Sequence, residues 1–278
     1  MIEKWLTIRN LRFCLCTWGP QDGPIVVILH GWLDQAASWR RVAEQLASEG
    51  RRVLAYDQRG HGRSDHAPTG SYYHFPNYVA DLDAFVRLLG LDQFTLVGHS
   101  MGGTVAARYA ALQIPQLKRL VLVDGLGPVA IDDVTATEQY VRHFSQLTNP
   151  PRHKPMPNLD AAISRMQRMN PSLTDSDARI LALRSTQPVV GGVVWRWDPL
   201  HRTRAAIGFD VDRHKLLLSR ISVPTTLVLG ESGWYSTIPD LDQRIACIPS
   251  VTDRIALDAE HAMHLDCPFK LAQAIIEA

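Results

Sequence analysis

The sequence predicts an α/β protein whose mostly parallel sheet carries helices on both faces. Short apolar runs at residues 25–29, 53–56, 94–97 and 119–123 alternate with helical periodicity at 36–49, 76–90 and 101–113. Runs that are apolar throughout, such as 25–29, are typical of strands buried on both faces. Regular alternation of strand and helix favours parallel strands joined by helical crossovers. A third observation is a Gly-His-Ser-Met-Gly turn at residues 98–102, between a strand and a helix.

The remaining elements divide the chain into a core and an insertion. Residues 4–18 alternate in polarity around a turn at Asn10, which predicts an opening hairpin. Residues 130–218 are mostly helical in pattern, with no strong buried strand and with a helix start at Asp198 and Pro199. Strand and helix patterns return at 224–229, 238–247, 251–257 and 268–277. We therefore expect a core of residues 1–128 and 219–278, interrupted by a helical unit at 129–218.

Composition narrows the class of protein. The 278 residues are 46% hydrophobic and 21% charged, which suits a globular protein with one sizeable core. A net charge of +1 gives no electrostatic case for nucleic acid or an anionic membrane, and no apolar run is long enough to span one. The N-terminus lacks the apolar stretch of a signal peptide, and the four cysteines form no zinc or CxxC pattern. These features predict a cytoplasmic protein with reduced thiols.

The Gly-x-Ser-x-Gly turn predicts a nucleophilic serine at Ser100. Glycine is required at Gly98 and Gly102 because the turn is too tight for side chains on either side. The turn raises the Ser100 hydroxyl above the sheet at a helix N-terminus, where developing negative charge is favoured. The alternative is a glycine-rich turn that only packs a helix close to the sheet.

A serine nucleophile needs a base and an oxyanion hole. His261 follows the last strand and precedes the last helix, so its loop can return the imidazole to Ser100. His264 is a second candidate base or a supporting residue. A zinc site at His261 and His264 is not expected, because the sequence shows no third ligand. The oxyanion donors are expected to be the backbone N–H groups of Met101 and Trp32, with the Trp32 indole lining the pocket.

At this point the chain resembles the α/β-hydrolase fold family over essentially its whole length. The matching pieces are His-Gly-Trp at 30–32, Asp-Gln-Arg-Gly-His-Gly-Arg-Ser at 57–64, the Ser100 turn, and His261, His264 and Pro268. The resemblance implies an eight-stranded sheet with a helical cap inserted after the sixth strand. It also implies a mostly structural role for Asp57 and Arg59. Residues 31–36 and 233–235 are similar to the serine hydrolase-like branch of the family.

The triad acid departs from the pattern of many family members. Where a Gly-Glu-x-Asp motif follows the seventh strand in those proteins, this chain has Gly-Glu-Ser-Gly, with Gly233 at the position of the acid. Asp124, at the end of strand 119–123, is the preferred candidate because some α/β-hydrolases place the acid there. Glu231 is an alternative, although it lies close to the strand end, and Asp240 or Asp242 lies farther along on an expected helix. Asp124 could also be a turn residue satisfied by backbone amides.

The expected activity follows from the nucleophile. Relatives that are dehalogenases or epoxide hydrolases carry aspartate at this turn, so Ser100 indicates acyl transfer. We expect a carboxylesterase-type serine hydrolase for a small to medium, largely apolar ester, with no cofactor and no metal. Thioester, lactone or carbon–carbon bond hydrolysis on the same triad, and ligand binding with little turnover, stay open, as does the oligomeric state.

Substrate contacts are expected mainly beside the triad. The candidates there are Trp32, His99, Trp234 and Tyr235. Within the cap, Trp195, Trp197, Met166 and Met169 could form an apolar pocket or could equally be cap core, and Arg196 could bind a carboxylate or pair with Asp198.

Overall fold

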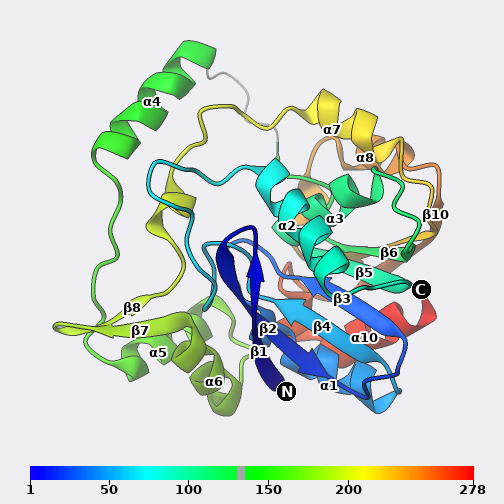
Figure 1. The fold of residues 1–278 in the computed structure, drawn as a ribbon, viewed down its shortest axis with the longest axis horizontal. Helices are drawn as coiled ribbons and strands as arrows, with labels where there is room; N and C mark the ends of the chain where they lie inside the picture. Colours follow the sequence, from blue (N-terminus) through cyan, green and yellow to red (C-terminus); the bar gives the residue numbers. More distant parts are fainter. Residues whose placement is uncertain (130–134) are drawn as a thin grey trace.

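The computed structural model describes residues 1–129 and 135–278, and its centre is an eight-stranded sheet (Figure 1). The strands lie in the order β1-β2-β4-β3-β5-β6-β9-β10. The first two pairings, β1 with β2 and β2 with β4, are antiparallel, and all later ones are parallel. The predicted fold class, a mostly parallel α/β sheet of this size, is thus confirmed. The strands are β1 Ile2–Ile8, β2 Leu11–Trp18, β3 Ile25–Leu29, β4 Arg52–Tyr56, β5 Phe94–His99, β6 Leu117–Val123, β9 Thr225–Gly230 and β10 Val251–Leu257.

Helices cover both faces of the sheet, which explains why its central strands are apolar throughout. In β3, Val27 and Leu29 pack against the layer of α2, α3, α7 and α8, whereas Val26 and Ile28 pack against α1 and α10. Successive side chains of a strand point to opposite faces, so both sets are removed from water. These helices are α1 Arg40–Ser48, α2 Phe75–Leu88, α3 Met101–Ala110, α7 Val211–Leu218, α8 Leu241–Ala246 and α10 Pro268–Glu277.

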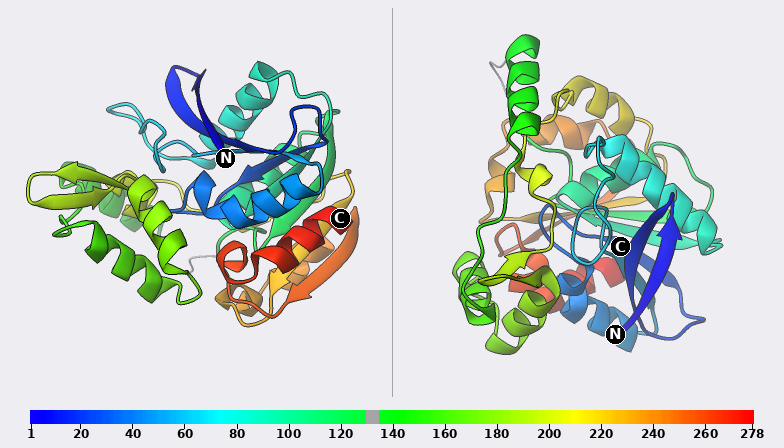
Figure 2. Two further views of the ribbon diagram at one scale, coloured as in Figure 1. Left: turned by 90° about the horizontal axis from the view of Figure 1, so that it is seen from below. Right: turned by 60° about the vertical axis from the view of Figure 1, so that its left-hand side comes forward.

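From residue 135 to α7, the chain lies outside the eight-stranded sheet and forms a small structure of its own (Figure 2). It holds α4 Ala136–Thr148, α5 Leu159–Met169, α6 Asp175–Ser185 and the 3-10 helix η2 Pro199–Arg202. Asp198 caps η2 as expected, since its Oδ1 accepts from the N–H of Leu200. The limits of the cap, at residues 129 and 218, stay a prediction.

A hairpin in this segment was not expected. Strands β7 Thr186–Val189 and β8 Gly192–Trp195 form a separate two-stranded sheet, and Val193 of β8 also makes an antiparallel bridge to Met156. The turn between them uses Gly191 and Gly192 with φ of 86° and 140°, a conformation that glycine adopts without strain. Each strand has four residues, too few for its pattern to reveal a strand in the sequence.

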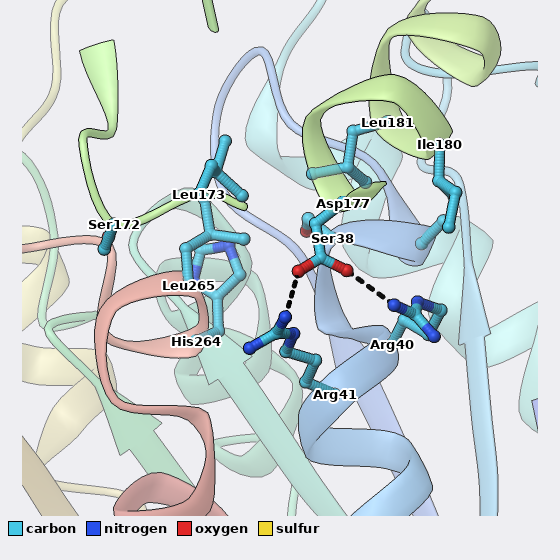
Figure 3. A pocket seen from close by; sticks show the side chains of 11 residues that line it. Ser38, Arg40, Arg41, Ser172, Leu173, Asp177, Ile180, Leu181, His264 and Leu265 are labelled. Carbon is cyan, nitrogen blue, oxygen red and sulfur yellow. Dashed lines mark hydrogen bonds and ion pairs between the residues drawn. The ribbon is translucent and has the colours of Figure 1, made fainter. Parts of the chain in front are cut away.

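The small structure is attached to the core through α6 and α1. The Asp177 carboxylate, at the start of α6, forms ion pairs with Arg40 and Arg41 of α1 (Figure 3). Beside these pairs lies a cavity of about 20 Å3, bounded by Leu181 and His264 among others, which has room for one water molecule. The contact fixes one end of the cap against the core.

Candidate active site

The turn at Ser100 joins β5 to α3 and has a strained backbone. Ser100 has φ 53° and ψ −117°, a conformation in which a non-glycine residue is strained. A Cβ added at Gly98 would lie 2.5 Å from the Gly102 carbonyl oxygen, and one added at Gly102 would lie 2.3 Å from that of Leu29. Both glycines are therefore required for the close packing of α3 on the sheet, as the sequence predicted.

Ser100, His261 and Asp124 form one hydrogen-bonded chain. Ser100 Oγ lies 3.0 Å from His261 Nε2, and His261 Nδ1 lies 3.1 Å from Asp124 Oδ2. Because a carboxylate accepts, Nδ1 carries the proton and Nε2 is left to accept from the serine hydroxyl. The chain thus has the order and tautomer of a nucleophile, a general base and an orienting acid.

Asp124 is fully buried, and the backbone around it holds the carboxylate in place. Its φ is 41°, its N–H donates to the Val228 carbonyl, and its Oδ1 accepts from the N–H of Gly230 at 3.1 Å. Burial raises the pKa of Asp124 above its ordinary value, and the hydrogen bonds from His261 and Gly230 oppose that rise. The two bonds therefore favour the charged form in a site that disfavours charge.

The other carboxylates considered for the acid are exposed or form ion pairs with other residues. Glu231 is exposed, Asp240 forms ion pairs with Lys215 and Arg244, and Asp242 pairs with Arg254. At Gly233, an added Cβ would lie 3.0 Å from the His261 backbone nitrogen, which leaves little room for a side chain. The geometry therefore favours Asp124.

The backbone N–H groups of Met101 and Trp32 are the predicted oxyanion donors. Met101 begins α3, so its N–H has no partner inside the helix. Trp32 follows Gly31. Gly31 packs so closely on the turn at Ser100 that an added Cβ would lie 3.3 Å from Ser100 Cβ. In the described part of the chain, neither N–H donates to another backbone group. Leu33, the next residue, has φ 58°, so the oxyanion loop is strained as well.

A cavity of about 490 Å3 opens above Ser100 between the core and η2. Its wall is rich in aromatic side chains, and no lysine, arginine or carboxylate side chain of the described residues lines it. Trp32 and Tyr235, two of the expected substrate contacts, line it together with Met101, and Trp32 is half exposed. The wall consists of Trp32, Tyr72, Tyr73, Phe75, Tyr78, Ser100, Met101, Thr104, Gly127, Pro128, Leu200, His201, Thr203, Ala205 and Tyr235.

His99 does not line this cavity. It is buried behind the triad, and its Nε2–H donates to the His261 carbonyl at 2.8 Å. His99 therefore contacts the loop that carries His261, and not the cavity where it was expected to contact the substrate. The Trp234 side chain lies outside the part of the chain that the structure describes.

The remaining cap residues singled out by the sequence lie away from the cavity. Met166 and Trp195 pack in the small core of the cap, Met169 is exposed, and Trp197 packs on His153. Arg196 donates to the Thr186 carbonyl. None of the five appears in the cavity wall.

Residues missed at the sequence level include an aromatic group around the start of α2. Tyr72, Tyr73, Phe75 and Tyr78 all reach the cavity, and Tyr72 donates to the Thr203 carbonyl on its far side. The closely spaced aromatic residues at the helix start were the available signal. Their direction depends on the loop conformation, which the sequence pattern does not give.

His264 and the residues of the 57–64 motif have structural surroundings. The His264 ring stacks on Trp39 with centroids 4.9 Å apart, and its Nε2 lies 3.3 Å from Asp34 Oδ2. Arg59 forms a buried ion pair with Asp81. Among the described residues, no cluster of histidine, cysteine and carboxylate side chains could hold a metal ion.

The sheet and its strained strand–helix turn define an α/β hydrolase, and comparison with known proteins agrees. A sequence model of the alpha/beta hydrolase fold matches residues 24–268, so the chain belongs to this family. It is 32% identical to a serine hydrolase-like protein of Danio rerio, covering 94% of this chain and 82% of that protein. A non-heme chloroperoxidase of Streptomyces lividans is 41% identical over 42% of both chains.

A solved structure extends the comparison. The thioesterase domain of the curacin biosynthetic pathway is similar with a TM-score of 0.92 and 35% identity, over 99% of both chains. No helix in the described part of this chain is long and apolar enough to cross a membrane.

Proposed function

We propose that the protein is a serine hydrolase that cleaves small to medium, largely apolar esters through an acyl-enzyme intermediate. The observation that carries the proposal is the hydrogen-bonded chain from Ser100 through His261 to Asp124, with distances of 3.0 and 3.1 Å. Its position at the floor of an aromatic cavity brings nucleophile and substrate pocket together.

Each residue has a defined step in the reaction. Ser100 Oγ attacks the ester carbonyl while His261 Nε2 takes the hydroxyl proton. The new imidazolium is stabilised by Asp124, and the oxyanion by the N–H groups of Met101 and Trp32. His261 then gives its proton to the leaving alcohol, and water activated by His261 releases the acid and restores Ser100.

The cavity wall defines the acyl group. Three of its four tyrosine hydroxyls have protein partners: Tyr72 donates to Thr203, Tyr73 to Asp198 and Tyr235 to the Gly127 carbonyl, whereas the Tyr78 hydroxyl has none among the described residues. No lysine or arginine of the described residues lines the wall, which favours an uncharged acyl group, because a buried carboxylate would lack a cationic partner. We therefore expect neutral esters to be preferred to hemiesters of dicarboxylic acids.

The test is hydrolysis of a chain-length series of p-nitrophenyl esters by the wild type and three variants. We expect Ser100→Ala, His261→Ala and Asp124→Asn each to lose about 10⁴-fold in kcat. Full activity in Asp124→Asn would reject Asp124 as the acid and direct the same experiment to Glu231. Labelling by a fluorophosphonate, absent in Ser100→Ala, tests the nucleophile independently of the substrate chosen.

A thioester is the second candidate substrate, and the similarity to a thioesterase domain over the full chain favours it. The triad and oxyanion hole serve both ester types. Matched oxygen and sulfur esters of one acyl group therefore separate them, and a higher kcat/KM for the thioester would select this candidate. Labelled protein that turns over neither type would instead indicate a lactone, a carbon–carbon bond or a ligand-binding role.

A further inference from the structure

Helix α4 has an apolar face that no part of the described chain covers. Tyr140, Val141, Phe144 and Leu147 are 45%, 62%, 58% and 42% exposed, and their spacing places them on one side of the helix. The Tyr140 and Phe144 rings stack with centroids 5.8 Å apart. Figures 1 and 2 show α4 standing clear of the other helices. A contiguous exposed apolar face of this kind marks an interaction site.

A second side of α4 forms the rim of the active-site cavity. Gln139 Nε2 donates to the Ala205 carbonyl, and His143 Nδ1 donates to that of Arg204. The His143 ring also packs edge-on against Tyr72, with centroids 4.8 Å apart. Ala205 and Tyr72 line the cavity, so α4 contacts its rim through Gln139 and His143.

Unpaired cations accompany the apolar face. Arg142 is on α4, Arg202 and Arg204 flank the cavity residue Thr203, and Arg152 and Lys154 follow α4 in the chain. All five are exposed, and in the described part of the chain none forms an ion pair. The carboxylate of α4, Glu138, accepts from Thr135 in a capping box at the helix start.

We propose that α4 lies in the surface of an anionic lipid membrane or micelle, with the rim of the cavity facing the lipid. A helix with one apolar side and nearby cations binds at such a surface. Its apolar side is buried among the lipid chains, and its cations pair with the anionic headgroups. A second copy of the chain fits less well, because a two-fold contact through α4 would set the same cations against each other. The inference concerns a surface and does not depend on the reaction at Ser100.

The test is flotation of the purified full chain with vesicles of phosphatidylcholine alone or containing 30% phosphatidylglycerol. We expect binding to the anionic vesicles only, weakening as salt rises. The double variant Val141→Ser with Phe144→Ser should bind at least about tenfold more weakly, whereas Leu216→Ser, an equally exposed residue on α7, should not. Arg202→Gln with Arg204→Gln should reduce the salt dependence, and Arg254→Gln on β10 is its control.

Three results would overturn the inference. Wild-type protein that does not bind anionic vesicles would show that α4 is not a lipid-binding helix. Equal binding to neutral vesicles would show that anionic charge has no part in the binding. A dimer in solution that Phe144→Ser converts to a monomer would assign the face to a second copy. Hydrolysis of a water-soluble short ester is measured on the same samples, because none of the substituted residues lines the cavity. Loss of vesicle binding with this hydrolysis intact separates a failure of the surface from a failure of the proposed reaction.

Discussion

At the scale of single residues, the triad rests on a layer of buried histidines. His99 is neutral, because burial, and then the nearby His264 and His261, lower its pKa well below the ordinary value. Its Nε2–H holds the His261 carbonyl, and its Nδ1 faces Gly31 of the oxyanion loop. One imidazole therefore contacts the nucleophile turn, the base loop and the oxyanion loop.

Replacement of His99 should affect the rate more than substrate binding. We expect His99→Phe to lower kcat about 10- to 100-fold with KM changed less than about threefold, because the His261 loop loses its anchor. His99→Gln keeps a donor and should recover part of the rate. Steady-state kinetics measure both, and equal loss in the two variants, or a loss confined to KM, would contradict a positioning role.

Asp34 links stability to pH. Burial alone would raise its pKa, but the hydrogen bond and charge of His264 lower it to about 2. A lowered carboxyl pKa stabilises the fold above the unfolded value near 4, and this contribution is lost as pH falls from about 4 to about 2. Between about pH 4 and pH 2, we expect the unfolding free energy of the wild type to fall by roughly 2 kcal/mol more than that of Asp34→Asn. Urea unfolding at stepped pH measures it, and parallel curves for wild type and variant would refute it.

At the scale of elements, the functional loops are strained where they meet. Ser100, Asp124 and Leu33 all have positive φ, and they lie in the loops after β5, β6 and β3. The Gly-x-Ser-x-Gly turn could be predicted because its glycines are visible in the sequence. The strain at Leu33 and Asp124 could not, because tertiary packing forces ordinary residues into that conformation.

The contact between α6 and α1 is the element-scale feature most open to test. Asp177 accepts from two arginines of α1, so Asp177→Asn removes an ion-pair network that joins cap to core. Since the pairs are partly exposed, we expect a loss of about 1 kcal/mol in unfolding free energy, smaller at high salt. Chemical unfolding measures this, with Asp160→Asn on exposed α5 as the control. A change equal to that of the control would show that the contact contributes nothing.

At the scale of the whole molecule, segments far apart in the sequence form the cavity. One side comes from Ser100, Met101 and the aromatic group around the start of α2, and the segment 200–205 closes the other side. Ala205→Phe should fill part of the 490 Å3 space. We expect rates on long p-nitrophenyl esters to fall at least about tenfold while acetate hydrolysis changes little. A uniform loss across chain lengths would indicate a damaged fold instead.

Sequence patterns predicted the sheet and the order of its elements, because periodicity is local, and glycine spacing marked the turn at Ser100. The triad stays a prediction, which the hydrogen-bonded chain of Ser100, His261 and Asp124 supports. The patterns did not predict the β7–β8 hairpin, whose strands are too short to show a period. They also misplaced His99, whose direction depends on the loop after β10. The net charge of +1 did not predict the cations beside α4, because a net charge does not show where charged residues lie in the fold.

The pairing of β5 with β6 has a consequence for the order in which the site is completed. The Ser100 N–H donates to the Val123 carbonyl, so nucleophile and acid are neighbours on adjoining strands. His261 comes from the far end of the chain, after the cap and β9. A nascent chain on the ribosome would carry a serine and an aspartate already side by side, without a base. For the proposed reaction, the base would be in place only after β10 has paired with β9, so an unfinished polypeptide would lack it.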